Sequence, residues 1–289
     1  MPNLLPSLDG RELTVDAALK RPTVIRDRIA QLADEQLLAP RFFRPLGARI
    51  EGAGLLYSVV KASDFYTSPV ERRAPGTEYV AVEGVEPTPK LALVEDHGGF
   101  FEITDEQIIR NEVNYLDQQV TQLANTISKR LDTLAMAAVA TSDVESIAIL
   151  GTWSGLVFEG PLDAITPSAN RPLGHLSTAQ LEADLDELGV RLNLVVTHPQ
   201  NAHQLRVAYG QDLDAALKSA GLELYANAQI PVNTVYVIEK ANVGLVGFEV
   251  ALTTEVVDIR ERRTKRVQSY VVATFGVDRP YAAKKLTLA

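Results

Sequence analysis

The feature that most constrains this chain is one long stretch, from Thr104 to Ala140, that contains neither glycine nor proline. Its apolar residues recur at steps of three and four, which is the period of one face of an α-helix. They are Ile109, Val113, Leu116, Val120, Leu123, Ile127, Leu131 and Leu134. Thr104 and Gln107 have the spacing of a capping box, so the pattern predicts that the helix begins at Thr104. At about 1.5 Å per residue, a helix over 104–140 would be a stiff rod of roughly 55 Å with one apolar face.

The composition is that of a globular protein without thiol chemistry. The 289 residues include no cysteine, which excludes disulfide bonds, thiolate metal sites and cysteine nucleophiles. The hydrophobic share of 46% is ordinary for a folded domain. No apolar run approaches 18 residues and no basic segment precedes an apolar one at the N-terminus, so we expect neither a membrane span nor a signal peptide.

The charge balance argues against a protein that grips nucleic acid. The formal net charge is −9, whereas binding to phosphate needs a basic face. One basic cluster nevertheless lies within seven residues and is interleaved with acidic ones. It consists of Arg260, Arg262, Arg263, Lys265 and Arg266. The cluster has two interpretations, a solvated hairpin tip or an ionic contact between subunits.

The first hundred residues have little capacity to form a core of their own. Five prolines divide residues 1–45, where only Thr23–Leu38 has the pattern of a short amphipathic helix. Residues 46–100 read as a long hairpin, with β-prone runs at Leu56–Val60 and Tyr79–Val82. The middle of the hairpin is polar and includes Glu71, Arg72 and Arg73. An isolated hairpin is marginal in water, so both segments are expected to lie against a partner surface.

The remainder mixes helices and strands, so the predicted class is α+β. We expect a helix from Ser177 to Gly189, with Leu181, Leu185 and Leu188 on one face, and a second from Asp212 to Ala220. The predicted strands are Leu192–Thr197, Leu222–Tyr225, Thr234–Ile238, Val243–Leu252, Thr253–Arg260 and Lys265–Phe275.

Searches for catalytic or metal-binding patterns give no enzyme. His198 and His203 are five residues apart and lack a nearby carboxylate to complete a metal site. The run 151–155 (Gly-Thr-Trp-Ser-Gly) places its serine one position late for a nucleophile elbow, so we interpret it as a turn held by the only tryptophan. Glu182 and Asp186 are interpreted as acidic residues on a solvated helix face. We therefore predict no enzymatic activity, no cofactor and no metal.

The order of these parts resembles the major capsid proteins of tailed bacteriophages, which share the Hong Kong 97 fold. The resemblance extends over essentially the whole chain and depends on order and context, because none of its local segments is a catalytic signature. The most specific segments are 104–111 (TDEQIIRN) running into 131–135 (LDTLA), 194–201 (LVVTHPQN), 230–232 (IPV) and 271–282 (VVATFGVDRPYA).

The resemblance implies a division of the chain into four parts. Residues 1–45 would form an N-terminal arm, and residues 46–100 an extended loop with its flanking strands. A peripheral domain would comprise 101–190 and 253–289, including the spine helix 104–140. Residues 191–252 would form an axial domain around five-fold and six-fold axes.

The resemblance also implies the partners of the chain. Copies would assemble through pentamers and hexamers into an icosahedral shell that encloses double-stranded DNA without sequence-specific binding. Assembly would occur in the host cytoplasm, with the virion as destination. The candidate contact residues are Glu71, Arg72 and Arg73 together with the basic cluster at 260–266.

Three further expectations concern how the shell is built. The scaffold would be a separate protein or absent, since the arm before the extended loop is short, and portal and decoration proteins would be separate chains. Covalent cross-linking between subunits is not expected, although Lys61 and Lys90 lie in or beside the loop. The alternative is an encapsulin-type nanocompartment, which shares the fold, encloses an enzyme cargo and would hold a cargo peptide in an apolar groove.

Overall fold

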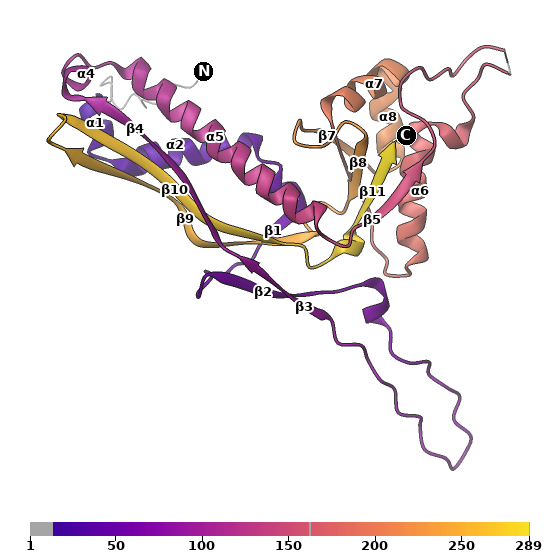
Figure 1. The fold of residues 1–289 in the computed structure, drawn as a ribbon. Helices are drawn as coiled ribbons and strands as arrows, with labels where there is room; N and C mark the ends of the chain where they lie inside the picture. The colour runs from indigo at the N-terminus through magenta and orange to yellow at the C-terminus, as the bar shows by residue number, and fades with distance from the viewer. Residues whose placement is uncertain (1–13, 162, 289) are drawn as a thin grey trace.

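The computed structural model describes residues 14–161 and 163–288 (Figure 1). Within these ranges the chain forms helices and three sheets, which confirms the predicted α+β class. The α-helices are α1 Val15–Leu19, α2 Pro22–Gln36, α3 Ala39–Phe42, α4 Asp105–Ile109, α5 Val113–Ala140, α6 Pro172–Leu185, α7 Pro199–Tyr209 and α8 Leu213–Ser219. The strands are β1 Phe43–Pro45, β2 Gly54–Val59, β3 Thr88–Leu93, β4 Glu95–Thr104, β5 Glu145–Ile149, β6 Leu194–Thr197, β7 Glu223–Ala226, β8 Thr234–Ile238, β9 Gly244–Ile259, β10 Thr264–Gly276 and β11 Ala283–Leu288.

The three sheets lie in different parts of an elongated molecule. The four-stranded sheet has the order β1-β9-β10-β4 and runs beside α5 at the left of Figure 1. The five-stranded sheet has the order β5-β11-β8-β6-β7 and lies at the right with α6, α7 and α8. The third sheet is the antiparallel pair β2-β3, from which a long loop projects away from the body.

Helix α5 belongs to two hydrophobic clusters. Near its start, Leu116 and Val120 pack with α1, α2 and the strands β4 and β10. Near its end, Ala135 and Val139 pack with α3 and with strands of the five-stranded sheet. A single stiff element therefore joins both sheets. No helix in the described ranges is long and apolar enough to cross a membrane.

The prediction of a single helix from Thr104 to Ala140 is wrong in one respect, because the structure forms two helices there, α4 and α5. The capping box is present, with the Gln107 N–H donating to Thr104 Oγ1 at 3.3 Å, but α4 ends at Ile109. Asn111 then adopts a positive φ of 54°, a conformation that asparagine tolerates. Its Oδ1 accepts a hydrogen bond from the Val15 N–H at 3.0 Å, so a tertiary contact holds the break. The uninterrupted rod, α5, has 28 residues and a length of about 42 Å.

Other predicted elements changed in extent. The two strands predicted over 243–260 are one, β9, and the β-prone run Tyr79–Val82 forms no strand. Helix α6 begins at Pro172 rather than at Ser177. The leucines predicted to share one face do not form its buried side, which consists of His175, Leu176, Ala179 and Ala183 among others.

The predicted division into peripheral and axial domains stays a prediction, but three segments lie in a different sheet from the one it suggests. Strands β5 and β11, grouped by sequence with the peripheral domain, belong to the five-stranded sheet. The first half of β9, grouped with the axial domain, pairs with β10 in the four-stranded sheet. The chain thus crosses between the two sheets more often than its linear order indicates.

Asp132 connects three parts of the chain from the middle of α5. Its side chain is buried, and Oδ1 accepts the backbone N–H groups of Leu38 at 2.8 Å and Ala39 at 3.1 Å at the start of α3. The side chain of Asn227, in the loop after β7, also donates to it. Burial raises the pKa of this carboxyl above its ordinary value, although these hydrogen bonds act in the opposite direction. The carboxyl oxygens therefore tie the arm and the five-stranded sheet to α5.

We expect Asp132→Ala to lower the free energy of unfolding by about 2–3 kcal/mol, because two backbone N–H groups lose their acceptor inside the protein. Asp132→Asn keeps an acceptor oxygen and should cost less than about 1 kcal/mol at pH 7. Because the folded-state pKa is raised, the wild type should gain stability relative to Asp132→Asn as the pH falls through that pKa toward 3.8. Denaturant unfolding of soluble subunits between pH 4 and pH 7 measures both effects, and equal stability of the two variants would contradict this role.

Candidate assembly surfaces

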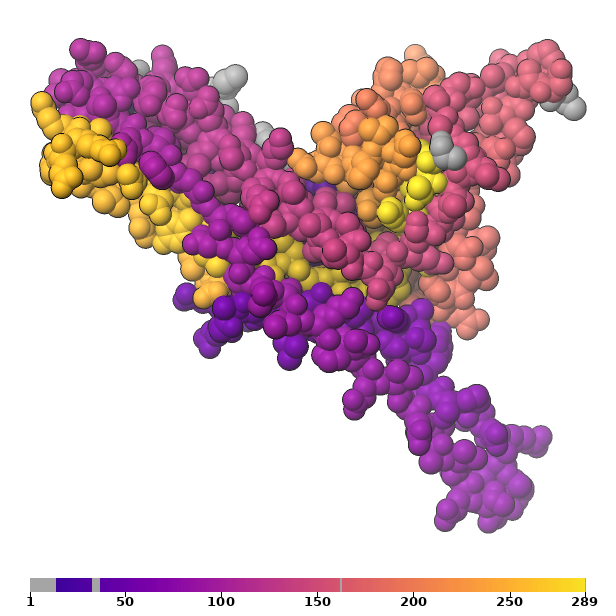
Figure 2. All heavy atoms as spheres, in the orientation of Figure 1, coloured from indigo at the N-terminus to yellow at the C-terminus, as the bar shows by residue number. Residues whose placement is uncertain are grey.

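The extended loop leaves the body without a surface of this chain to cover it. Beyond the paired strands β2 and β3, residues 66–87 form no regular element, and they project outward in Figures 1 and 2. Ser68 and Glu83 join the two arms, through the Ser68 N–H to the Glu83 carbonyl at 3.0 Å and the Glu83 N–H to Ser68 Oγ at 3.1 Å. The loop therefore holds its own shape in part but buries almost nothing.

Apolar side chains of this loop are exposed to an extent unusual for a finished surface. Val70 is 83% exposed and Tyr79 is 77% exposed. Further exposed apolar residues are Phe65, Tyr66, Val80, Val82 and Val85. Because contiguous exposed apolar surface marks interaction sites, the loop has the composition of a contact segment.

The three candidate residues of the loop lie together near its tip and are all exposed. Arg73 is held by its own loop, since Nη1 donates to the Thr77 carbonyl at 3.0 Å and the guanidinium lies over the Tyr79 ring, 4.8 Å from its centroid. Glu71 and Arg72 have no ion pair within the described residues. Their charges are thus available to another molecule.

Two arginines of the charged turn between β9 and β10 have ion-pair partners within the chain. Arg260 lies 4.0 Å from Asp105, and Arg263 lies 3.8 Å from Asp105 and 3.9 Å from Glu106, so both contact the acidic first turn of α4. These pairs are exposed and each contributes little to stability. They do fix the turn against α4, which the sequence did not indicate.

Two other residues of the basic cluster also have partners in the same chain. Arg266 pairs with Glu102 at 2.9 Å and lies over the Phe100 ring at 4.2 Å, and Lys265 lies 3.8 Å from Asp16. Arg262 has no ion pair within the described residues and is exposed. Of the five candidates in this cluster, Arg262 is therefore the one best placed to contact another subunit.

A buried lysine that sequence analysis missed lies where the loop meets the five-stranded sheet. The Lys284 side chain is 2% exposed, and its Nζ pairs with Asp186 at 2.9 Å and with Glu145. Burial by itself lowers the pKa of Lys284, but the hydrogen bonds with Glu145 and Asp186 outweigh burial and raise it. Nothing in the pattern of β11 distinguishes Lys284 from the neighbouring Lys285, so only the fold could identify it.

The base of the loop contacts this same region. Lys61 and Lys90 lie 3.6 Å and 3.7 Å from Asp143, just after α5. The Tyr66 hydroxyl donates to the Glu187 carbonyl at 3.2 Å, and the Phe65 ring packs edge-on against Tyr281 at 5.3 Å. These contacts set the direction in which the loop leaves the body.

The described residues contain no group of three or more histidine, aspartate or glutamate side chains that could hold a metal ion. His198 instead caps α7, where Nδ1 accepts the Gln200 N–H at 3.1 Å. The Trp153 side chain is buried in its turn and donates from Nε1 to His175 Nδ1 at 3.1 Å, and burial lowers the pKa of His175. These polar groups have structural partners rather than the arrangement of a reactive site.

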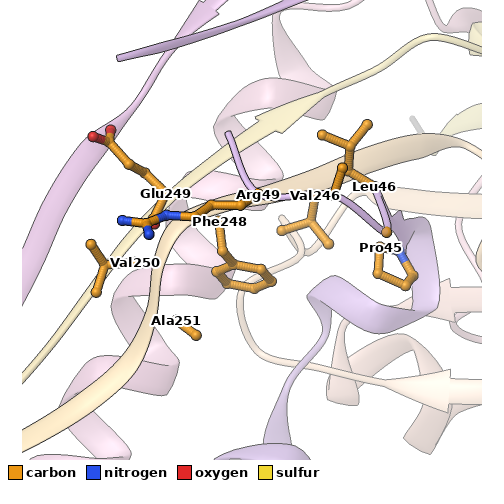
Figure 3. Close-up of a pocket in the computed structure, with 10 residues that line it drawn as sticks. Pro45, Leu46, Arg49, Val246, Phe248, Glu249, Val250 and Ala251 are labelled. Atoms are coloured by element: carbon orange, nitrogen blue, oxygen red, sulfur yellow. The ribbon is translucent and has the colours of Figure 1, made fainter. Parts of the chain in front are cut away.

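An apolar groove lies beside the four-stranded sheet, between the segment after β1 and the first half of β9 (Figure 3). Its volume is about 540 Å³, and its lining includes Leu46, Val246 and Phe248. Arg49 crosses one side, where Nε donates to the Glu249 carbonyl at 2.7 Å. The groove has the shape and polarity to receive an apolar segment but no constellation for chemistry.

The comparisons with known proteins define the class of this chain. Residues 86–286 match the family model described as phage capsid protein, which covers more than half of the chain. The chain therefore belongs to the phage capsid protein family. No curated protein matches it.

Solved structures of capsid proteins and related particles have the same fold. The capsid of the cyanophage P-SCSP1u matches with a TM-score of 0.61 and 14% identity, over 89% of this chain and 88% of that one. The virus-like particle from Pyrococcus furiosus matches with a TM-score of 0.60 and 15% identity, over 91% of this chain and 97% of that one. A chain of Mycobacterium phage Bobi matches with a TM-score of 0.59 and 12% identity, over 88% of this chain and 91% of that one. The expected Hong Kong 97 fold is confirmed, and the chain is a structural subunit of a capsid shell.

Replacing Lys284 tests the buried ion pair at the base of the loop. We expect Lys284→Met to lower the free energy of unfolding by about 2 kcal/mol, because two carboxylates lose a charge-assisted partner. Lys285→Met is the matched control and should change it by less than about 0.5 kcal/mol. Because the folded-state pKa of Lys284 is raised, the wild type should lose stability at alkaline pH as Lys284 loses its proton. The difference in free energy of unfolding between the wild type and Lys284→Met should therefore diminish there. Denaturant unfolding measures this, and equal losses for the two variants would contradict it.

Proposed function

We propose that this chain is the major capsid protein of a tailed phage, and that it assembles through pentamers and hexamers into an icosahedral head around double-stranded DNA. Membership of the phage capsid protein family and the shared fold support this proposal. Assembly takes place in the host cytoplasm, and the finished shell is part of the virion.

The observation that carries the proposal is the extended loop. Its apolar side chains, such as Val70 and Tyr79, are exposed although they would favour burial. A loop of this kind acquires a stable conformation when it lies over a second copy. The same holds for the free charges of Glu71 and Arg72 near the tip. Shell formation thus supplies what the isolated subunit lacks.

Assembly then follows from the sum of many modest contacts. Each interface can be small, because every copy in a closed shell makes several at once. The loop tip, with Glu71, Arg72 and Arg73, forms one contact. The turn at Arg262, held against α4 by Arg260 and Arg263, forms a second. Arm residues 1–45 form a third, of which 1–13 lie outside the described residues.

Reversing the charges of Arg72 and Arg73 to glutamate should abolish particles and leave folded, soluble subunits, because both side chains are exposed in the subunit and their replacement removes nothing from its core. The conservative double variant Arg72→Lys/Arg73→Lys keeps the charge and should still form particles. Electron microscopy gives the particle yield and circular dichroism the fold. A normal yield from the glutamate variant would refute the role of the loop tip.

The acidic balance of the chain suits a wall that encloses DNA without binding a sequence. With a formal net charge of −9, intact particles should elute from heparin at low salt without retention, because like charges repel. Chromatography at about 50 mM salt, with a basic DNA-binding protein as positive control, measures this. Strong retention would contradict passive enclosure. Separate scaffolding, portal and decoration proteins complete our proposal for the partners.

A second candidate function is an encapsulin-type nanocompartment that encloses an enzyme. The apolar groove of about 540 Å³ beside β9 favours it, since such a shell needs a place for a cargo peptide (Figure 3). The shared fold of a virus-like particle from Pyrococcus furiosus is compatible with either function. The contents of native particles separate the two, because a phage head holds a DNA genome and a nanocompartment holds protein.

A further inference from the structure

The outward face of α6 is apolar and acidic, which is unusual for a helix with a solvated face. Leu181 is 55% exposed and Leu185 is 66% exposed, and their spacing of four places them side by side. The opposite side of the same helix is buried in the core of the five-stranded sheet. Helix α6 is therefore apolar on two sides, of which this chain covers one.

Charge on this outward face has a single sign. Glu182 and Asp184 accompany the two leucines, and neither has an ion pair within the described residues. Asp184 only accepts a hydrogen bond from Gln180, at 2.8 Å. Asp186 is excluded from the face, because it pairs with Lys284. Helix α6 contains no lysine or arginine, so the face is acidic throughout.

Helix α7 has the complementary properties. Its Val207 is 70% exposed beside Arg206, which has no ion pair within the described residues, and α7 contains no acidic residue. A groove of about 330 Å³ opens next to Val207 and is lined partly by Trp153 and Leu156. The face therefore combines a partly apolar recess with an exposed arginine on the same helix.

The two helices cover the same sheet near opposite ends of its strand order. Helix α6 packs against β11, next to the edge strand β5, whereas α7 packs against the other edge strand, β7. In Figure 1, α6 stands at the right of this lobe and α7 at its top. One face of a subunit can therefore meet the other face of the next copy, and a repeated contact of this heterologous kind forms a ring when the rotation between copies closes.

We propose that α6 of one copy docks on α7 of the next, with Leu185 and Leu181 entering the groove beside Val207 and with Glu182 and Asp184 facing Arg206. This contact is the lateral bond of the pentamers and hexamers, and so it rests on the proposed function. It commits both faces to a second copy of this chain, because each supplies the shape and charge that the other lacks.

Cross-linking tests the contact directly, because the natural chain has no cysteine. In particles of the variant Leu185→Cys/Val207→Cys, a short bismaleimide should give a ladder of covalent oligomers that ends at five or six copies on a denaturing gel. Each single variant should give no product above a dimer. A control pair, Leu185→Cys/Val257→Cys, uses another exposed position, 47% exposed on β9 against 70% for Val207, and should give no ladder. Intact particles without a ladder, or a ladder from the control pair as well, would overturn the contact.

Charge exchange provides a second test that does not depend on cysteine geometry. Glu182→Arg and Arg206→Glu should each lower the particle yield about tenfold, and the combined variant should restore it, because every contact in a ring is then complementary again. Yields equal to the wild type for the single variants would overturn the contact, as would failure of the combination to restore assembly. The two proposals remain separable, since the loss of the ladder from particles that still form counts against the contact alone, whereas native particles that hold no DNA genome count against the proposed function.

Discussion

The packing of α5 into two hydrophobic clusters holds this elongated molecule together, because no other helix of residues 14–161 and 163–288 contributes to both. One end of α5 packs on the four-stranded sheet with Leu116, and the other end packs toward the five-stranded sheet with Val139. Asp132 reinforces the junction from the middle, where its Oδ1 accepts two backbone N–H groups at the start of α3. A stiff helix that packs into both clusters keeps the two sheets at a fixed separation. A subunit of a closed shell requires such a fixed geometry.

Around this rigid body, the uncovered surfaces follow a common physical pattern. The extended loop exposes Val70 and Tyr79, and α6 exposes Leu181 and Leu185. A monomer in water gains nothing from such exposure, and patches of this kind are characteristic of surfaces that meet a partner. The charged turn at 260–263 differs, because Arg260 and Arg263 are already paired with α4. Burial and pairing within the chain thus separate positions that support the subunit from positions left for assembly.

Sequence patterns predicted local features well and tertiary ones poorly. The capping box at Thr104 and the strand Thr234–Ile238 are local, and both are present in the structure. The break at Asn111 depends on a hydrogen bond to Val15, distant in sequence, and no periodicity reveals it. The role of Lys284 likewise depends on Asp186, which comes close only in the fold. For the candidate contacts, sequence identified charge clusters but not which charges the chain itself neutralises.

Helix α6 illustrates why an apolar stripe alone cannot tell which face is inside. Periodicity favours Leu181, Leu185 and Leu188 as the core face, yet the core takes the smaller residues Ala179 and Ala183. Small residues let the helix approach the sheet closely, and Leu181 and Leu185 are left exposed on the other side, whereas Leu176 and Leu188 pack with the core. In a monomeric protein this arrangement would waste the stronger hydrophobic surface. In a subunit that meets identical neighbours, the same arrangement places the larger apolar side chains where a contact between copies can bury them.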